Sequence, residues 1–198
     1  MANVARTIEN LQKRGYHVNR FPTKQAAADY IVETVGDHTV GMGGSVSLVE
    51  LDVYDRLCAR GETLWHMFTN EPGMKEKATK APVYMMSANG ISESGQIINI
   101  DGLGNRVAMM CYGPKRLLIV IGINKIAPDD TTALWRARNI ASPKNCRRLS
   151  KKTPCSVGEI TCHDCNSPDR ICRIFVTLER PPIGMDVDVI IVDEALGF

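Results

Sequence analysis

The first half of the chain alternates apolar patterns of helical and strand type. Val4, Ile8 and Leu11 recur at helical spacing, which predicts a helix within residues 1–20 that ends at Gly15. Such an alternation implies a mostly parallel sheet with helices on its faces. The later elements expected here are a helix capped by Thr23, strands near 39–40, 63–68 and 83–87, a helix with Val46, Val49, Val53 and Leu57 on its core face, and a helix over 72–80.

The pattern changes in the second half of the chain. Residues 95–101 and 105–112 flank a Gly-Leu-Gly turn and predict an antiparallel hairpin. Residues 116–123 are continuously apolar, as is typical of a strand buried on both faces. A helix beginning at Pro128 and two closing strands at 173–178 and 187–192 are also expected. Because the chain shows no repeat and no low-complexity linker, we expect one α/β domain over residues 1–198.

Composition narrows the possible functions only a little. The 198 residues are 44% hydrophobic and 23% charged, with a formal net charge of +2. This balance is typical of a globular protein and predicts binding neither to nucleic acid nor to a membrane. The start of the chain lacks the apolar core of a signal peptide, so we expect a cytoplasmic protein whose thiols stay reduced. A homo-oligomer is compatible with these features.

Four of the seven cysteines lie close together, with spacings of six, two and six residues. They are Cys155, Cys162, Cys165 and Cys172. Four thiolates suit tetrahedral zinc or an iron–sulfur cluster, and His163 could replace one of them as a ligand. Four reduced thiols, or two disulfides formed in air, are the alternative. Cys58, Cys111 and Cys146 lie on apolar or helical stretches and are expected to be inert.

Two polar segments are candidate ligand sites. Gly41, Gly43, Gly44 and Ser45 lie between a predicted strand and a predicted helix, where backbone amides favour an anion. A glycine-rich turn that only packs a helix on a strand is the alternative. In the second segment Asn89, Glu93, Asp101, Asn105 and Arg106 lie among glycines, where they either contact a polar substrate or form turns. Lys125 follows the buried strand and could face a site at the carboxyl end of that strand, but a solvated surface position is expected for it.

These segments together resemble the LUD-domain family of lactate-utilisation proteins, from about the second helix to Phe198. The matching segments are Gly41–Ser45, Ala88–Gly95, Asn99–Arg106, Gly122–Ile126, Ser167–Arg170 and Val189–Glu194. The resemblance implies a three-layer α/β/α fold with a mostly parallel sheet, related to sugar-phosphate isomerases and CoA transferases. It adds Asp169 and Arg170 to the candidate ligand site.

The resemblance also implies a function. Family members act with iron–sulfur partner proteins in the oxidation of lactate to pyruvate. We therefore expect a protein of organic-acid metabolism that binds a small carboxylate or phosphate-bearing ligand. The larger relatives carry a C-x2-C-x2-C-x3-C-P run, which this chain lacks, so electron transfer by this chain alone is not expected.

Two other functions are open. Residues Ser92–Gly95 resemble the tetrapeptide that carries the attacking glutamate of CoA transferases, with Glu93 as nucleophile and Ser94 where the family usually has Asn. The other function is non-enzymatic: a scaffold subunit whose metal loop docks an iron–sulfur partner.

Overall fold

The computed structural model describes residues 3–198 and contains two β-sheets. The larger sheet has six strands in the order β1-β10-β7-β4-β2-β3, and every pairing in it is parallel. The smaller sheet has the order β8-β5-β6-β9 and is mixed. The strands are β1 His17–Phe21, β2 Val40–Met42, β3 Thr63–Leu64, β4 Val83–Met86, β5 Gly90–Ser92, β6 Ile97–Asp101, β7 Arg116–Gly122, β8 Ile126–Ala127, β9 Ile174–Leu178 and β10 Asp186–Val192.

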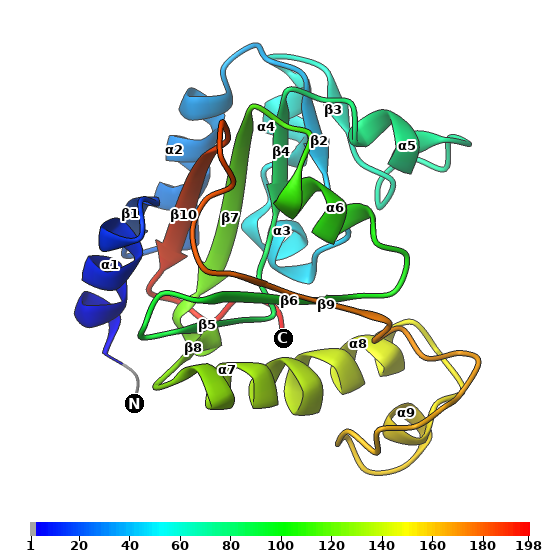
Figure 1. The fold of residues 1–198 in the computed structure, drawn as a ribbon. Helices are drawn as coiled ribbons and strands as arrows, with labels where there is room; N and C mark the ends of the chain where they lie inside the picture. The colour runs from blue at the N-terminus through cyan, green and yellow to red at the C-terminus, as the bar shows by residue number, and fades with distance from the viewer. Residues whose placement is uncertain (1–2) are drawn as a thin grey trace.

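The helices are short, and four of them, within residues 24–78, connect successive strands of the larger sheet (Figure 1). They are α1 Val4–Lys13, α2 Lys24–Val35, α3 Val46–Leu51, α4 Tyr54–Cys58, α5 Met74–Ala78, α6 Asn105–Cys111, the 3-10 helix η1 Ile123–Lys125, α7 Asp130–Arg136, the π-helix η2 Ala137–Ala141, α8 Ser142–Arg148 and α9 Pro154–Val157.

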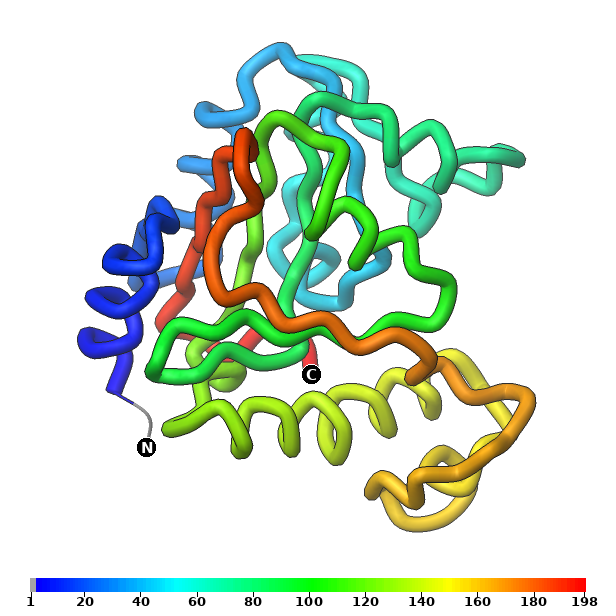
Figure 2. The backbone as a smooth tube through the Cα atoms, viewed as in Figure 1, coloured from blue at the N-terminus to red at the C-terminus, as the bar shows by residue number. Residues whose placement is uncertain are grey.

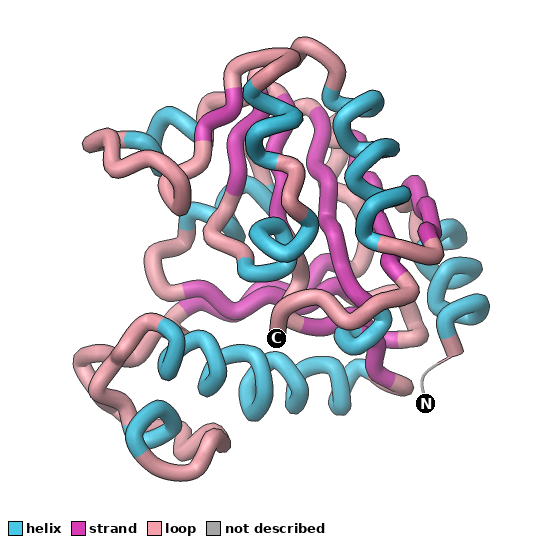
Figure 3. The backbone as a smooth tube through the Cα atoms, turned by 180° about the vertical axis from the view of Figure 1, so that it is seen from behind, coloured by secondary structure: helices cyan, strands magenta, loops and turns pink. Residues whose placement is uncertain are grey.

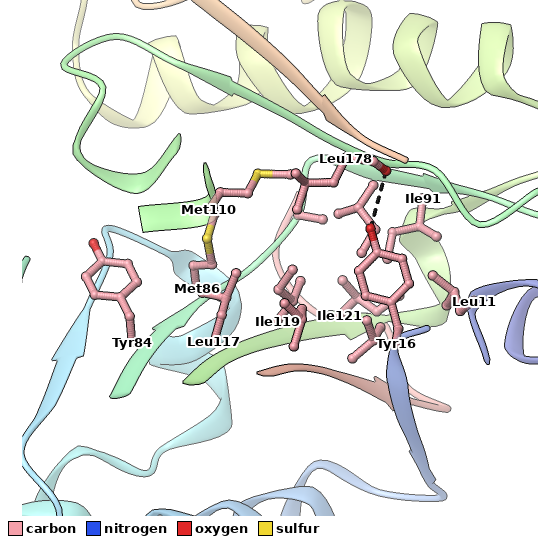
Figure 4. Packing of buried hydrophobic residues seen from close by; sticks show 14 of the residues in the cluster. Leu11, Tyr16, Tyr84, Met86, Ile91, Met110, Leu117, Ile119, Ile121 and Leu178 are labelled. Atoms are coloured by element: carbon pink, nitrogen blue, oxygen red, sulfur yellow. Dashed lines mark hydrogen bonds between the residues drawn. The ribbon is translucent and has the colours of Figure 1, made fainter. Parts of the chain in front are cut away.

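The larger sheet is buried on both faces, as the apolar run of β7 predicted. Leu118 and Val120 of β7 pack with α2, α3 and α4 on one face, which Figure 3 shows from behind. Leu117, Ile119 and Ile121 pack on the other face, against α1, α6 and the smaller sheet. Figure 4 shows this second cluster, with Met86 and Met110 between the strands and α6. Each of these buried side chains contributes about 1.5–3 kcal/mol of transfer free energy.

A further layer lies under the smaller sheet. In Figure 1, α7, η2 and α8 form one continuous helical run below β5, β6 and β9. Ala133 and Ala137 of this run pack against Ile98 and Ile100 of β6. The predicted layered α/β fold with a mostly parallel sheet is therefore confirmed, and the smaller sheet with its helical run is added to it.

The structure corrects the hairpin predicted around Gly102-Leu103-Gly104. Residues Asn105–Cys111 form α6, because Asp101 accepts hydrogen bonds from the amides of Arg106 and Val107 and so starts a helix. The antiparallel partner of β6 is β5 on one side and β9 on the other. An apolar run such as Val-Ala-Met-Met is compatible with either a strand or a buried helix.

Three smaller predictions also change. The helix expected over 46–57 is two helices, because Asp52 adopts a left-handed conformation with φ 56°. Its core face is Leu48, Leu51, Val53 and Leu57, whereas Val49 is exposed. The strand expected over 63–68 covers only Thr63–Leu64. In the segment 1–20, residues 4–13 are helical and β1 begins at His17, while residues 1 and 2 lie outside the described part.

No helix within residues 3–198 is both long enough and apolar enough to span a bilayer.

Candidate functional site

Three loops meet at the carboxyl edge of the larger sheet. They follow β2, β4 and β7, and contribute Gly44 to Ser47, Ser87 to Asn89, and Lys125. In open parallel sheets this edge is where ligands bind, because side chains and amides of several loops converge there. A cavity of about 250 Å³ lies at this edge.

The opposite wall of the cavity comes from the smaller sheet and the helices beside it. Ile100 and Asp101 end β6, Asn105 and Arg106 begin α6, and α8 adds Asn145 and Arg148. The cavity therefore lies between the larger sheet and the added layer. The other lining residues are Val46, His66, Lys75, Gly102, Leu103, Ala141, Leu149, Ile171 and Phe198.

Lys125 lies on the floor of this cavity and is only 4% exposed. Its Nζ donates to Ser47 Oγ at 2.7 Å, to Ser87 Oγ at 2.8 Å and to the Ala88 carbonyl at 3.1 Å. Three acceptors match the three N–H groups of a protonated amine. The expectation of a solvated surface lysine is therefore wrong, because η1 turns the side chain inward at the end of β7.

Burial lowers the pKa of Lys125 to about 7, since water cannot solvate the ammonium there. The nearby guanidinium groups of Arg136 and Arg106 lower it further, and Glu50 opposes them. The amine can therefore gain or lose its proton near neutral pH. A ligand anion beside Nζ would favour the protonated form.

Arg106 and Asp101 form an ion pair at the side of the cavity. Their closest atoms, Arg106 Nη2 and Asp101 Oδ1, are 3.5 Å apart, and both side chains are nearly buried. Arg106 also donates to the Ile100 carbonyl at 2.7 Å. Asp101 is the only acidic side chain among the described lining residues, and its charge is already matched by Arg106.

The glycine loop makes room for side chains. A Cβ on Gly43 would lie 2.8 Å from Arg106 Cγ, and one on Gly44 would lie 3.3 Å from His66 Nε2. Gly44 and Ser45 line the cavity, whereas Gly41 packs on the Ala78 backbone away from it. Ser45 Oγ accepts from the Leu48 amide at 3.3 Å, so this hydroxyl caps α3.

Asn89 and Arg136 tie the two sheets together next to the cavity. Asn89 Oδ1 accepts from the Ile100 amide at 2.8 Å. The Arg136 guanidinium donates to the carbonyls of Asn89, Asn124 and Phe198. Burial lowers the pKa of Arg136 to about 10, which leaves it charged at neutral pH.

Glu93 lies apart from this cavity, at the end of β5 next to α1. Its Oε1 accepts from the Asn3 amide at 2.6 Å, and its backbone carbonyl accepts from Asn10 Nδ2, also at 2.6 Å. Arg6 lies 3.8 Å from the other carboxylate oxygen. These contacts dock the first helix, and they do not bring Glu93 to the other predicted site residues.

The Cys-rich loop projects beyond the end of α8 (Figure 2). Of its residues only Ile171 reaches the cavity. Asp169 accepts from the Lys152 amide, and Arg170 donates to the carbonyls of Cys165 and Cys172, so both hold the loop itself. The structure therefore does not bring Asp169 and Arg170, which the family resemblance suggested, to the ligand site.

The four predicted metal ligands are free, half-buried thiols. Within residues 3–198 no three or more His, Cys, Asp or Glu side chains are grouped so as to hold a metal ion. Cys155 instead lies beside Cys146 and Thr153. Burial raises the pKa of Cys146 to about 11 and makes this thiol unreactive. As placed, the thiols do not fit a metal, and the zinc or iron–sulfur site stays a prediction.

Several lining residues were not predicted from the sequence. Ser47, Ser87, His66 and Arg148 lie in segments assigned to a helix face, a strand end or a surface. Lys125 had a usable signal, since it follows a strand buried on both faces and so lies at the ligand-binding edge. Its burial and its hydrogen bonds to Ser47 and Ser87 identify Lys125 as a site residue, and only the folded structure shows them.

Comparison with known proteins supports the family seen in the sequence. The family model for the LUD domain matches residues 4–192. A solved structure, a DUF162 family protein from Deinococcus radiodurans, superposes with a TM-score of 0.56 over 96% of this chain and 95% of that chain, at 11% identity. That similarity concerns the fold. No curated protein matches the chain. Since the family model covers nearly the whole sequence, the chain belongs to the LUD-domain family, which is associated in general with lactate utilisation.

Proposed function

We propose that the protein binds a small carboxylate or phosphate-bearing ligand in this cavity and supports the oxidation of lactate to pyruvate together with iron–sulfur partner proteins. The observation that carries the proposal is Lys125, a buried cation on the cavity floor that contacts no carboxylate among the described residues. A buried charge is costly unless it is paired, and a bound anion supplies the partner.

The surroundings of Lys125 favour an anion as well. Lys75, Arg106 and Arg148 also line the cavity, against one acidic side chain. The Ser45, Ser47 and Ser87 hydroxyls and the Asn89 amide lie in the same lining. Fixed donors of this kind orient carboxylate oxygens.

A partner protein is needed because the oxidation of lactate requires an electron acceptor. Conversion of lactate to pyruvate releases two electrons and two protons, so an acceptor must take the electrons. The chain lacks the ferredoxin-type cysteine run, and an iron–sulfur partner would supply the acceptor. The role left to this chain is to bind a small anionic ligand in the cavity.

The acyl-transfer alternative has less support. Its nucleophile, Glu93, caps the first helix and lies outside the cavity that the other candidate residues line. A carboxylate nucleophile must reach the acyl carbon beside the groups that bind the substrate.

Calorimetric titration of lactate, pyruvate and inorganic phosphate into the purified chain tests the proposal. We expect binding to the wild type and a loss of at least about tenfold in affinity for Lys125→Met, because the charge on the floor is removed. Lys115→Met is the matched control, since Lys115 is exposed and precedes β7 at the opposite edge of the sheet.

Circular dichroism and thermal melting would establish that both variants are folded. If none of these anions binds the wild type, or if Lys125→Met binds them as tightly as Lys115→Met, the proposal is wrong. Co-purification from cell extract with an iron–sulfur protein tests the partner, and a protein that always purifies alone counts against it.

A further inference from the structure

The cations of the cavity lie on its two opposite walls. Lys125 belongs to the larger-sheet side, where Ser47 and Ser87 hold its Nζ. Arg148 belongs to the added layer, near the end of α8, with Asn145 and Ile171 also in the lining. The Nε of Arg148 donates to Asn145 Oδ1 at 3.0 Å.

Neither of these two charges is compensated by the protein. In the described part of the chain, the ion pairs include neither Lys125 nor Arg148. The one acidic side chain of the lining, Asp101, is engaged by Arg106 and by the first amides of α6. A ligand with a single negative charge would therefore pair with one wall and leave the other unpaired.

Arg148 is an exposed residue, so its charge is accessible to a ligand at the rim of the cavity. What burial the guanidinium has lowers its pKa, and the group stays charged at neutral pH. Lys75, which is exposed, and His66 also line the cavity, and the only acidic side chain of the described lining is Asp101, which is paired with Arg106. Burial, followed by the charge of Lys75, lowers the pKa of His66 and keeps it neutral at pH 7.

The size of the cavity limits the ligand to a small molecule. Its volume of about 250 Å³ lies below the roughly 300–1,000 Å³ of pockets that bind drug-sized ligands. This is enough for a short organic acid with two charged ends. It is too small to enclose a nucleotide or a CoA thioester, which need larger pockets.

We infer that the ligand of this cavity is a small organic acid with two anionic groups, a dicarboxylate or a phosphorylated carboxylate, that bridges Lys125 and Arg148. This inference rests on the proposed function and names the ligand class of the same site. One anionic group pairs with Lys125 among the serine hydroxyls. The second pairs with Arg148 of the added layer, so the ligand connects the two walls.

Two matched pairs of probes test the inference by calorimetry at low salt. Malate differs from lactate by one carboxylate, and phosphoglycolate differs from glycolate by one phosphate. We expect each dianion to bind at least about tenfold more tightly than its matched monoanion, because it pairs with both cations. The stronger of the two dianions then tells whether carboxylate or phosphate is preferred.

The variant Arg148→Gln should abolish the preference for dianions, because the affinity for each dianion falls and the affinity for its matched monoanion falls less. Lys144→Gln is its matched control: it removes one positive charge from an exposed position of α8 outside the cavity lining. This variant should keep the preference. Because Arg148 is at the surface, its replacement is expected to leave the fold intact, which melting curves would verify.

The outcomes separate the two proposals. If no probe binds the wild type, the proposed function fails. If lactate and glycolate bind but the dianions bind no more tightly, only the two-anion inference is overturned. The inference is overturned as well if Lys144→Gln weakens dianion binding as much as Arg148→Gln, since the preference would then reflect general charge alone.

Discussion

Arg106 lies directly against Gly43, so closely that a Cβ on Gly43 would come within 2.8 Å of Arg106 Cγ and 3.1 Å of its Cδ. The glycine loop after β2 therefore determines where the guanidinium lies, and with it the Asp101 ion pair. Because Gly43 has no side chain, Arg106 can occupy the space beside it at the cavity.

Gly43→Ala is expected to displace Arg106 and to destabilise the fold by about 1–3 kcal/mol, the usual cost of overpacking. Gly41→Ala should cost more, because its Cβ would meet the Ala78 carbonyl oxygen at 2.0 Å and backbone cannot rotate aside. Urea unfolding compares the two variants. Equal losses of stability would show that Arg106 is as rigid as the backbone.

Replacement of Lys125 should change how stability depends on pH. The pKa of Lys125 is about 7 in the folded chain and 10.5 in the unfolded chain, so between these values the unfolded state binds more protons. The burial penalty is therefore complete below pH 7 and is relieved as the pH rises toward 10. The wild type should gain on the order of a few kcal/mol over this range relative to Lys125→Met.

Urea unfolding of both proteins at pH 6, 8 and 9.5 would measure this difference. Parallel pH profiles for the two proteins would mean that Lys125 keeps its proton throughout the range.

Anion binding should be coupled to proton uptake above pH 7. The groups that bear on Lys125 are Arg136 and Arg106, which disfavour its charge, and Glu50, which favours it. An added anion favours the ammonium, so affinity should fall as the pH rises through about 7. Calorimetry in buffers of different ionisation enthalpy measures the protons taken up. A pH-independent affinity, matching that of Lys125→Met, would rule out this coupling.

Asp101→Ala should destabilise the protein by about 1–2 kcal/mol, the usual cost of removing a helix cap. Its carboxylate accepts from the amides of Gly102, Arg106 and Val107 at 2.9, 3.1 and 3.4 Å, and it pairs with Arg106. Removing the acid also frees the Arg106 charge, so anion affinity should rise. Thermal melting and calorimetry report the two effects separately. Unchanged stability would mean that water replaces the Asp101 carboxylate as the hydrogen-bond acceptor of these amides.

If the Cys-rich loop binds a metal, its cysteines should be protected from alkylation. Cys155, Cys162, Cys165 and Cys172 should resist alkylation in anaerobically purified protein and become reactive after chelation. Cys58 and Cys111, which are exposed, should react in both cases, and Cys146, which is buried, in neither. Absorbance distinguishes an iron–sulfur cluster from zinc. Reactivity of the four thiols without any chelator, together with metal analysis that finds neither element, would reject both metals.

Much of the fold could be predicted because local patterns agree with the tertiary structure. The apolar run at β7 and the caps Thr23 and Ser45 lie where the sequence predicts them. The helix α6 was mistaken for a strand because Asp101, which starts it, belongs to the preceding strand. Its capping role arises only once β6 is paired.

The candidate site was predicted less completely than the fold. Gly44, Ser45 and Asn89 line the cavity because they follow strands that end at one edge of the larger sheet. Asp101, Asn105 and Arg106, at and after the end of β6 in the smaller sheet, line the same cavity from the opposite wall. Glu93 lies elsewhere because β5 pairs with β8 and points its end toward the first helix. Arg148 could not be foreseen, because its distance from the sheet depends on how a distant helix packs.

The π-helix between α7 and α8 determines which side of α8 faces the cavity. Ala141, Asn145 and Arg148 line the cavity from this side, and the buried Arg136, which packs beside the cavity, precedes Ala141 by five residues across the π turn. One residue corresponds to about 100° of rotation in an α-helix. Deleting a single residue from Ala137–Ala141 would thus turn α8 by about a quarter of its circumference and point Arg148 away from the ligand. In this segment the number of residues, more than their identity, determines which residues of α8 face the cavity.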